Sequence, residues 1–155
     1  MKEHILIIDR EPDIRKTLET LLEKEGYQVR SASGNEEATD ALKSEAYDLV
    51  IMDINMPGTN GLQVMRNIKK LEESIEVIIV TGLTSIDNAV QALRSDGAFD
   101  FLAKPLENES QLIISVKQAL EKRRLNREKN AFVREFRNHK LAGKNCRRIN
   151  EKNGL

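Results

Sequence analysis

Two carboxylates, a hydroxyl and an ammonium group each follow a short apolar run of the chain. These residues are Asp9, Asp53, Thr81 and Lys104. A short apolar run bounded by turn-forming residues is typical of a strand that is buried on both faces. Because the carboxyl ends of parallel strands meet at one edge of a sheet, we expect these side chains to lie close together, where open α/β sheets bind ligands.

The chemistry of these four groups favours phosphoryl transfer. Asp9 and Asp53 repel each other unless a cation lies between them, and clustered oxygen ligands suit Mg²⁺. Thr81 and Lys104 donate hydrogen bonds and therefore suit an anion. An acid, a hard cation and an anion clamp together describe a phosphoryl-transfer site, where positioning and charge neutralisation do most of the work. Taken alone, Asp53 is equally well explained as the cap of the turn that follows it.

The elements that position these residues alternate along the chain. Five strands are expected, at residues 5–8, 27–32, 49–52, 77–80 and 99–103. Five segments with apolar residues at helical spacing follow the strands, beginning near residues 12, 33, 62, 86 and 107. Ser33 and Glu36 form a capping-box pattern at the start of the second helix. This alternation predicts an α/β fold with a parallel sheet covered by helices on both faces.

Length and composition exclude several classes of protein. A chain of 155 residues suits one domain with an appendage. Its apolar runs fall well short of the roughly 18 residues that a membrane helix needs, and the first run is too short for a signal peptide. The single cysteine, Cys146, excludes an internal disulfide and a metal site built from several cysteines. It also fits a reducing cytosol, so we expect a cytoplasmic protein without a membrane partner.

The charges divide the chain into an acidic body and a basic tail. Residues 1–120 hold 13 Lys and Arg against 21 Asp and Glu, whereas residues 121–155 hold 12 against 4. The helical pattern continues over residues 121–142, and residues 143–155 are predicted to be disordered. This extension is too poor in apolar residues to be stable alone, although a partner would supply the missing burial. A solvated linker helix is favoured over DNA binding, because no helix-turn-helix pattern follows.

Four segments in the expected order are similar to the receiver domain of two-component response regulators, the CheY-like superfamily. They are ILIIDREPDIR (5–15), DLVIMDINMPGTNG (48–61), VIIVTG (77–82) and GAFDFLAKPL (97–106). The resemblance covers residues 1–120 and implies a flavodoxin-like, five-stranded parallel sheet. It also implies a phosphorylation-controlled switch rather than a turnover enzyme, with a histidine kinase or a phosphotransfer protein as the phosphoryl donor.

The resemblance assigns the acceptor and the metal pocket to particular residues. Asp53 corresponds to the phosphoryl acceptor, a carboxylate nucleophile that attacks a phosphohistidine. Asp9 corresponds to a member of the acidic pocket that binds Mg²⁺ together with Asp53. Asn55, two residues after the acceptor, is expected to offer its backbone carbonyl to the metal.

Three further positions match residues that respond to the phosphoryl group in this family. Thr81 is expected to hydrogen-bond the phosphoryl group, and Lys104 is expected to pair with it. Phe101 corresponds to the switch aromatic residue, which turns inward when the residue matching Thr81 moves. The peptide between Lys104 and Pro105 corresponds to one that is commonly cis, a form readily tolerated only before proline.

One departure from the family pattern concerns the metal. Two adjacent acids usually follow the first strand, but Arg10 follows Asp9 here, with Glu11 next. In one interpretation Arg10 faces solvent and Glu11 or water completes a weaker Mg²⁺ site. In the other, Arg10 pairs with Asp9 or Asp53 and replaces the cation.

These interpretations lead to two hypotheses about function. We favour a domain that accepts phosphate, because every other expected position is filled. The alternative is a phosphorylation-independent scaffold or dimerisation module, in which Arg10 has disabled metal binding and the extension carries the function. A homodimer and an output domain or partner protein are both compatible with the extension.

Overall fold

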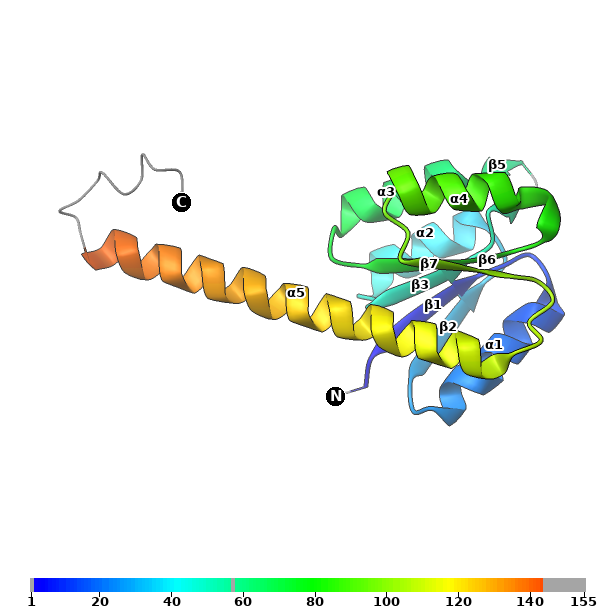
Figure 1. The fold of residues 1–155 in the computed structure, drawn as a ribbon, viewed down its shortest axis with the longest axis horizontal. Coiled ribbons are helices and arrows are strands. Elements are labelled where there is room, and N and C mark those ends of the chain that lie inside the picture. Colours follow the sequence, from blue (N-terminus) through cyan, green and yellow to red (C-terminus); the bar gives the residue numbers. More distant parts are fainter. Residues whose placement is uncertain (1, 57, 144–155) are drawn as a thin grey trace. The chain divides into compact units, whose positions relative to one another are not determined.

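Five parallel strands form the central sheet of the computed structural model, which describes residues 2–56 and 58–143. The strands are β1 (His4–Ile8), β2 (Gln28–Ala32), β3 (Leu49–Met52), β6 (Glu76–Thr81) and β7 (Asp100–Ala103). Their order in the sheet is β2-β1-β3-β6-β7 (Figure 1). Every residue of β3 and β6 is buried, as expected for central strands that are covered on both faces.

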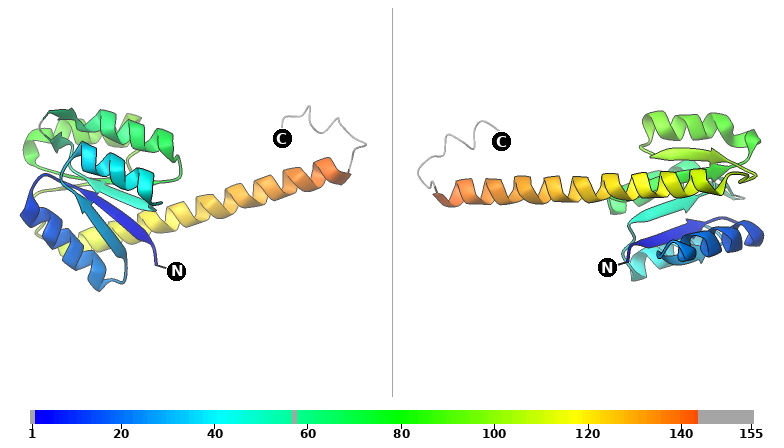
Figure 2. Two further views of the ribbon diagram at one scale, coloured as in Figure 1. Left: turned by 180° about the vertical axis from the view of Figure 1, so that it is seen from behind. Right: turned by 60° about the horizontal axis from the view of Figure 1, so that its bottom comes forward.

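Helices cover both faces of this sheet. They are α1 (Pro12–Lys24), α2 (Asn35–Ser44), α3 (Gly61–Leu71), α4 (Ile86–Ser95) and α5 (Glu109–Gly143), with a short 3₁₀ helix at Leu83–Ser85. One hydrophobic cluster joins the sheet to α2, α3 and α4 through residues such as Ala38, Met65 and Ala89. The other cluster joins it to α1 and α5 through residues such as Leu18 and Val116. Figure 2 shows the sheet between these two layers, which confirms the predicted flavodoxin-like class.

The chain divides into two units, residues 1–123 and 124–155. The first unit holds the whole sheet, and the helix expected over residues 121–142 is present as the later part of α5. The disorder predicted for residues 143–155 falls, apart from Gly143, outside the described residues. None of the described helices combines the length and hydrophobicity needed to cross a membrane.

Some local predictions differ from the structure. The predicted capping box is wrong: Glu37, rather than Glu36, accepts hydrogen bonds from the backbone and hydroxyl of Ser33. The second and fifth strands begin at Gln28 and Asp100, each one residue later than expected. Between β3 and α3, where a loop was expected, the two-residue strands β4 (Asn55–Met56) and β5 (Thr59–Asn60) pair in antiparallel fashion. A ladder this short leaves no periodic pattern in a sequence.

Ion pairs join the amino edge of the sheet to α5. Arg123 lies 2.8 Å from Asp48, the residue before β3, and the backbone of His4 donates to the same carboxylate at 2.8 Å. Lys122 lies 3.5 Å from the buried Glu76, the first residue of β6. The basic run at the start of the extension is therefore partly bound by the sheet, whereas a solvated helix was expected.

Candidate functional site

The sheet places Asp9 and Asp53 beside each other at its carboxyl edge. The two residues follow β1 and β3, which are neighbouring parallel strands. The backbone N–H of Asp53 donates to the carbonyl of Ile8 at 3.0 Å, and that of Asp9 donates to Ala32 at 3.1 Å. The hydrogen bonds of the sheet therefore extend one residue beyond β1 and β3, and they fix the backbone positions of both acids. Both are buried, at 1% and 4% exposure, so their charges must be satisfied inside the protein.

Both carboxylate oxygens of Asp53 have hydrogen-bond donors. Oδ1 accepts from the backbone N–H of Asn55 at 2.9 Å and from the hydroxyl of Thr81 at 2.7 Å. Oδ2 accepts from the ammonium of Lys104 at 2.9 Å. Thr81 is fully buried at the end of β6, so its hydroxyl has a fixed direction. The acid, hydroxyl and ammonium predicted to meet at this edge are thus in direct contact.

Lys104 is the centre of the site. Its backbone N–H donates to the carbonyl of Thr81 at 2.9 Å, and its peptide bond to Pro105 is cis, as expected. Its ammonium lies 2.8 Å from Asp9, 2.7 Å from Glu11 and 2.9 Å from Asp53. Burial alone lowers the pKa of this lysine, but the hydrogen bonds to the three carboxylates outweigh burial and raise the pKa above its usual value. The side chain therefore stays cationic.

Two hydrogen bonds and an ion pair fix the position of Asp9. Its Oδ1 accepts from the backbone N–H of Glu11 at 2.9 Å, and its carbonyl accepts from the guanidinium of Arg15 at 2.6 Å. Burial raises the pKa of Asp9, and the hydrogen bonds from Lys104 and from the Glu11 backbone act against this rise. Arg15, which no sequence pattern singled out, lies on the first turns of α1 and fixes the turn that carries Asp9.

The structure shows where Arg10 lies relative to the acidic residues. Its side chain is exposed, and among the described residues no ion pair joins it to Asp9 or Asp53. Lys104 is the cation that pairs with both acids. Arg10 is therefore exposed, as in the first interpretation, and Glu11 lies beside the two aspartates. That Glu11 or water completes a weaker Mg²⁺ site stays a prediction.

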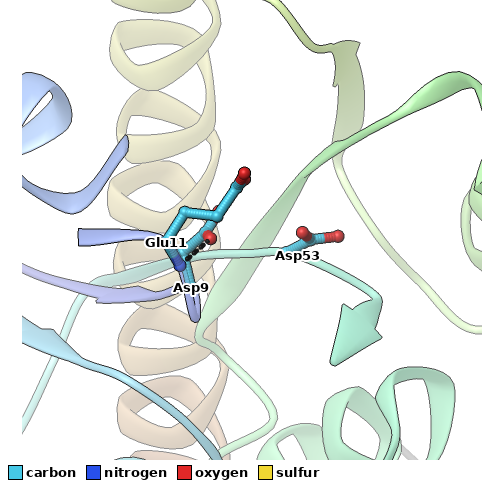
Figure 3. Close-up of side chains that lie close together, drawn as sticks. All are labelled: Asp9, Glu11 and Asp53. Carbon is cyan, nitrogen blue, oxygen red and sulfur yellow. Dashed lines mark hydrogen bonds between the residues drawn. The ribbon is translucent and has the colours of Figure 1, made fainter. Parts of the chain in front are cut away.

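The carboxylates of Asp9, Glu11 and Asp53 form a group that suits a hard cation. One oxygen from each lies within 4.8 Å of the others (Figure 3). Three carboxylate oxygens at this spacing match the ligands that Mg²⁺ prefers, and Asn55 follows two residues after Asp53. The residues present therefore fit the metal that the sequence predicts.

Phe101 lies in β7 and is not part of the carboxylate group. It is half-buried and packs against the hydrophobic cluster beneath α2, α3 and α4. Its backbone N–H donates to the side chain of Asp100 at 2.8 Å. Of the residues predicted for the site, Asp9, Glu11, Asp53, Thr81 and Lys104 are joined by direct contacts, and Asn55 joins through its backbone.

Comparison with known proteins places this geometry in a family. The family model described as the response regulator receiver domain matches residues 5–117. The chain is 41% identical over 121 residues to the C4-dicarboxylate transport transcriptional regulatory protein DctD of Rhizobium meliloti, covering 78% of this chain and 26% of that protein. It is 36% identical over 107 residues to sporulation initiation phosphotransferase F of Bacillus subtilis, covering 69% of this chain and 86% of that protein. The chain thus spans about a quarter of DctD but most of the phosphotransferase.

Solved structures agree with the sequence comparison. A receiver domain protein from Clostridium thermocellum superposes with a TM-score of 0.74 at 35% identity, covering 79% of this chain and 98% of that one. TrrA from Thermotoga maritima, solved with Mg²⁺ and beryllofluoride, superposes with a TM-score of 0.66 at 36% identity, covering 76% and 98%. The fold, the site geometry and these matches together show that the chain belongs to the response regulator receiver domain family.

Proposed function

We propose that the chain is a phosphorylation-controlled protein-interaction switch in which Asp53 accepts a phosphoryl group from a phosphohistidine. Receiver domains are signalling switches that interact with histidine kinases or phosphotransfer proteins. The observation that carries the proposal is the buried Asp53 carboxylate with Thr81 on one oxygen and Lys104 on the other. These partners orient the nucleophile, and each would donate to the transferred group once it releases the Asp53 carboxylate.

The proposed transfer uses residues already in contact. An oxygen of Asp53 attacks phosphorus, the bond from phosphorus to the donor histidine nitrogen breaks, and that nitrogen keeps the electron pair. Thr81 and Lys104 then hydrogen-bond the phosphoryl oxygens. Receiver domains bind Mg²⁺ at an acidic pocket, where the metal neutralises charge on the transferred group. In this chain Asp9, Glu11, Asp53 and the carbonyl of Asn55 would hold it.

The same contacts suggest how the signal leaves the site. Thr81 now donates to Asp53, and a phosphoryl group on that residue offers its hydroxyl a new acceptor. Thr81 ends β6, and its Cα pairs with Ala103 of β7, two residues after Phe101. A shift of Thr81 with Phe101 would remodel the surface formed by α4, β7 and α5. Phosphorylation shifts this equilibrium only by its different interaction with the two states.

Phosphorylation of Asp53 is tested directly with a small-molecule donor. In Mg²⁺ and acetyl phosphate, intact-protein mass spectrometry should show the gain of one phosphoryl group, and chelation of Mg²⁺ should prevent it. Asp53→Asn should abolish the gain, because an amide is not a nucleophile here. Asp40→Asn, at an exposed position on α2, is the control and should be labelled like the wild type. Labelling that persists in Asp53→Asn would contradict the proposal.

A second copy of the chain is a proposed partner for the extension. Within residues 124–137, where the side chains of this part of α5 are described, four large apolar side chains are exposed: Leu125, Phe132, Val133 and Phe136. Leu125, Phe132 and Phe136 follow each other by seven and four residues and share one face, and the two Phe rings stack at 6.4 Å. Burial against the same face of a second copy would supply the stability that this helix lacks alone.

Sedimentation of the whole chain tests this pairing. We expect a dimer for the wild type and a monomer for Phe132→Gln/Phe136→Gln, because two buried aromatic rings are lost from each copy. Arg127→Gln, which changes a neighbouring charged position, should remain dimeric. A wild-type monomer with and without acetyl phosphate would refute the pairing. A dimer indifferent to Asp53→Asn would support a constitutive dimerisation module.

A further inference from the structure

We propose that Lys104 is a built-in cation that competes with a divalent metal for the three carboxylates, and that Glu11 decides the outcome of this competition. The inference rests on the proposed function and concerns how its site is regulated. Arg10 stands where the family usually has a second acid, so this chain must obtain its metal ligands differently. The contacts of Lys104 and Glu11 indicate how it does so.

Three carboxylates surround the ammonium of Lys104 in this structure. A lysine ammonium carries three N–H donors. The ammonium of Lys104 donates to Glu11 at 2.7 Å and to Asp53 at 2.9 Å, and it forms an ion pair with Asp9 at 2.8 Å. To hydrogen-bond a phosphoryl oxygen, Lys104 must therefore release at least one carboxylate. In the observed state the ammonium of Lys104 therefore occupies the carboxylates that a metal would need, and it is not free to bind an anion.

The position of Lys104 makes it a direct competitor of the metal. One oxygen from each of the three acids lies within 4.8 Å of the others, and the ammonium lies within 3 Å of all three residues. A cation bound by the same oxygens would occupy the place of the ammonium, and two cations cannot share it. Three carboxylates face one ammonium, so the pocket retains excess negative charge that favours the exchange.

Glu11 is the carboxylate best able to move. The side chains of Asp9 and Asp53 are 2% and 6% exposed, whereas that of Glu11 is 52% exposed. Backbone N–H groups and Thr81 hold the two aspartates, but the carboxylate of Glu11 has Lys104 as its only hydrogen-bond partner among the described residues. Glu11 can therefore pass from Lys104 to the metal at little cost, while the aspartates stay in place.

This exchange gives Glu11 the role that Arg10 does not fill. When Glu11 and the aspartates hold the metal, the ammonium of Lys104 is released toward the phosphoryl oxygens. Metal binding thus frees the lysine for the anion, and the two events are coupled through one exposed side chain. Glu11 is a metal ligand in the metal-bound state and the ion-pair partner of Lys104 in the metal-free state.

Isothermal titration of the whole chain with Mg²⁺ tests the competition without using phosphorylation as the readout. Glu11→Gln should weaken Mg²⁺ binding by about tenfold or more, as when groups that support a metal site are removed. Lys104→Met should tighten Mg²⁺ binding by about tenfold, because the competing charge is gone. Lys104→Arg keeps a cation in place and should not tighten it. Glu36→Gln, an exposed glutamate on α2, is the control and should bind like the wild type.

A double substitution tests whether Mg²⁺ affinity depends on Glu11 because Arg10 supplies no carboxylate. Arg10→Asp restores the adjacent acid, so in that background Glu11→Gln should have little effect on Mg²⁺ affinity. Circular dichroism confirms that each variant is folded before titration. Unchanged Mg²⁺ affinity in Glu11→Gln, or unchanged or weaker affinity in a folded Lys104→Met, would overturn the exchange. If the wild type binds Mg²⁺ as described but is not labelled by acetyl phosphate, the proposed function fails while the exchange stands.

Discussion

Replacement of Lys104 with methionine should lower the free energy of unfolding by about 3 kcal/mol when no divalent cation is present. Methionine keeps much of the volume but leaves Asp9 and Asp53 buried without a counterion. Two close carboxylates in such a site repel each other, and each loses an ammonium partner at 2.8–2.9 Å. Chemical denaturation in a chelating buffer measures the loss.

Addition of Mg²⁺ should reverse much of this loss, because the metal takes the place of the missing ammonium. Asp53→Asn combined with Lys104→Met should likewise be more stable than Lys104→Met alone, since one buried charge is removed. Lys117→Met is the control: this lysine pairs with Glu25 at the surface and should contribute less than about 1 kcal/mol. Equal losses for the two lysines would show that Lys104 has no special structural role.

Replacement of Gly61 with valine should lower the free energy of unfolding by about 3 kcal/mol or more. Gly61 is the first residue of α3, and a Cβ atom built there lies 2.3 Å from the carbonyl oxygen and 2.5 Å from the Cα of Ile54. Both are backbone atoms, so the clash cannot be relieved by rotating a side chain. Because Ile54 follows Asp53, the same shift should also slow labelling by acetyl phosphate.

Gly82→Ala is the matched control for this effect. A Cβ atom at Gly82 meets nothing within 4 Å, and its φ lies outside the left-handed range, so the change should alter stability by less than about 1 kcal/mol. Gly61→Ala should be intermediate between Gly61→Val and Gly82→Ala. Thermal unfolding of the three variants gives the order, and a stable Gly61→Val would mean that the segment after Asp53 is more adaptable than the contacts indicate.

The sheet and the position of its polar edge could be predicted because they follow from local patterns. Buried parallel strands leave short apolar runs, and the residue after each run must lie at the carboxyl edge. Asp9, Asp53, Thr81 and Lys104 were found in this way. The cluster around Lys104 was harder to foresee in detail, because its contact with Glu11 joins residues 93 positions apart. Which acids share one ammonium depends on packing that no local pattern records.

The remaining differences have a similar cause. Whether Arg10 faces solvent or the pocket depends on the direction of the turn after β1, which Arg15 and the backbone of Glu11 fix. The partner of Ser33 is Glu37 because α2 begins one residue later than the capping pattern assumed. The pairing of Arg123 with Asp48 was missed because both charges look like ordinary surface residues in a sequence.

The ion pairs between α5 and the amino edge of the sheet limit where this domain can be fused to another domain. The apolar residues of α5 that reach the core end at Leu120, which makes this residue an obvious junction for fusing the receiver to a separate domain. A fusion made there would remove the cations that Lys122 and Arg123 supply to Glu76 and Asp48. A fusion protein should therefore retain Lys122 and Arg123. Alternatively, the fused domain should supply basic residues at these two positions.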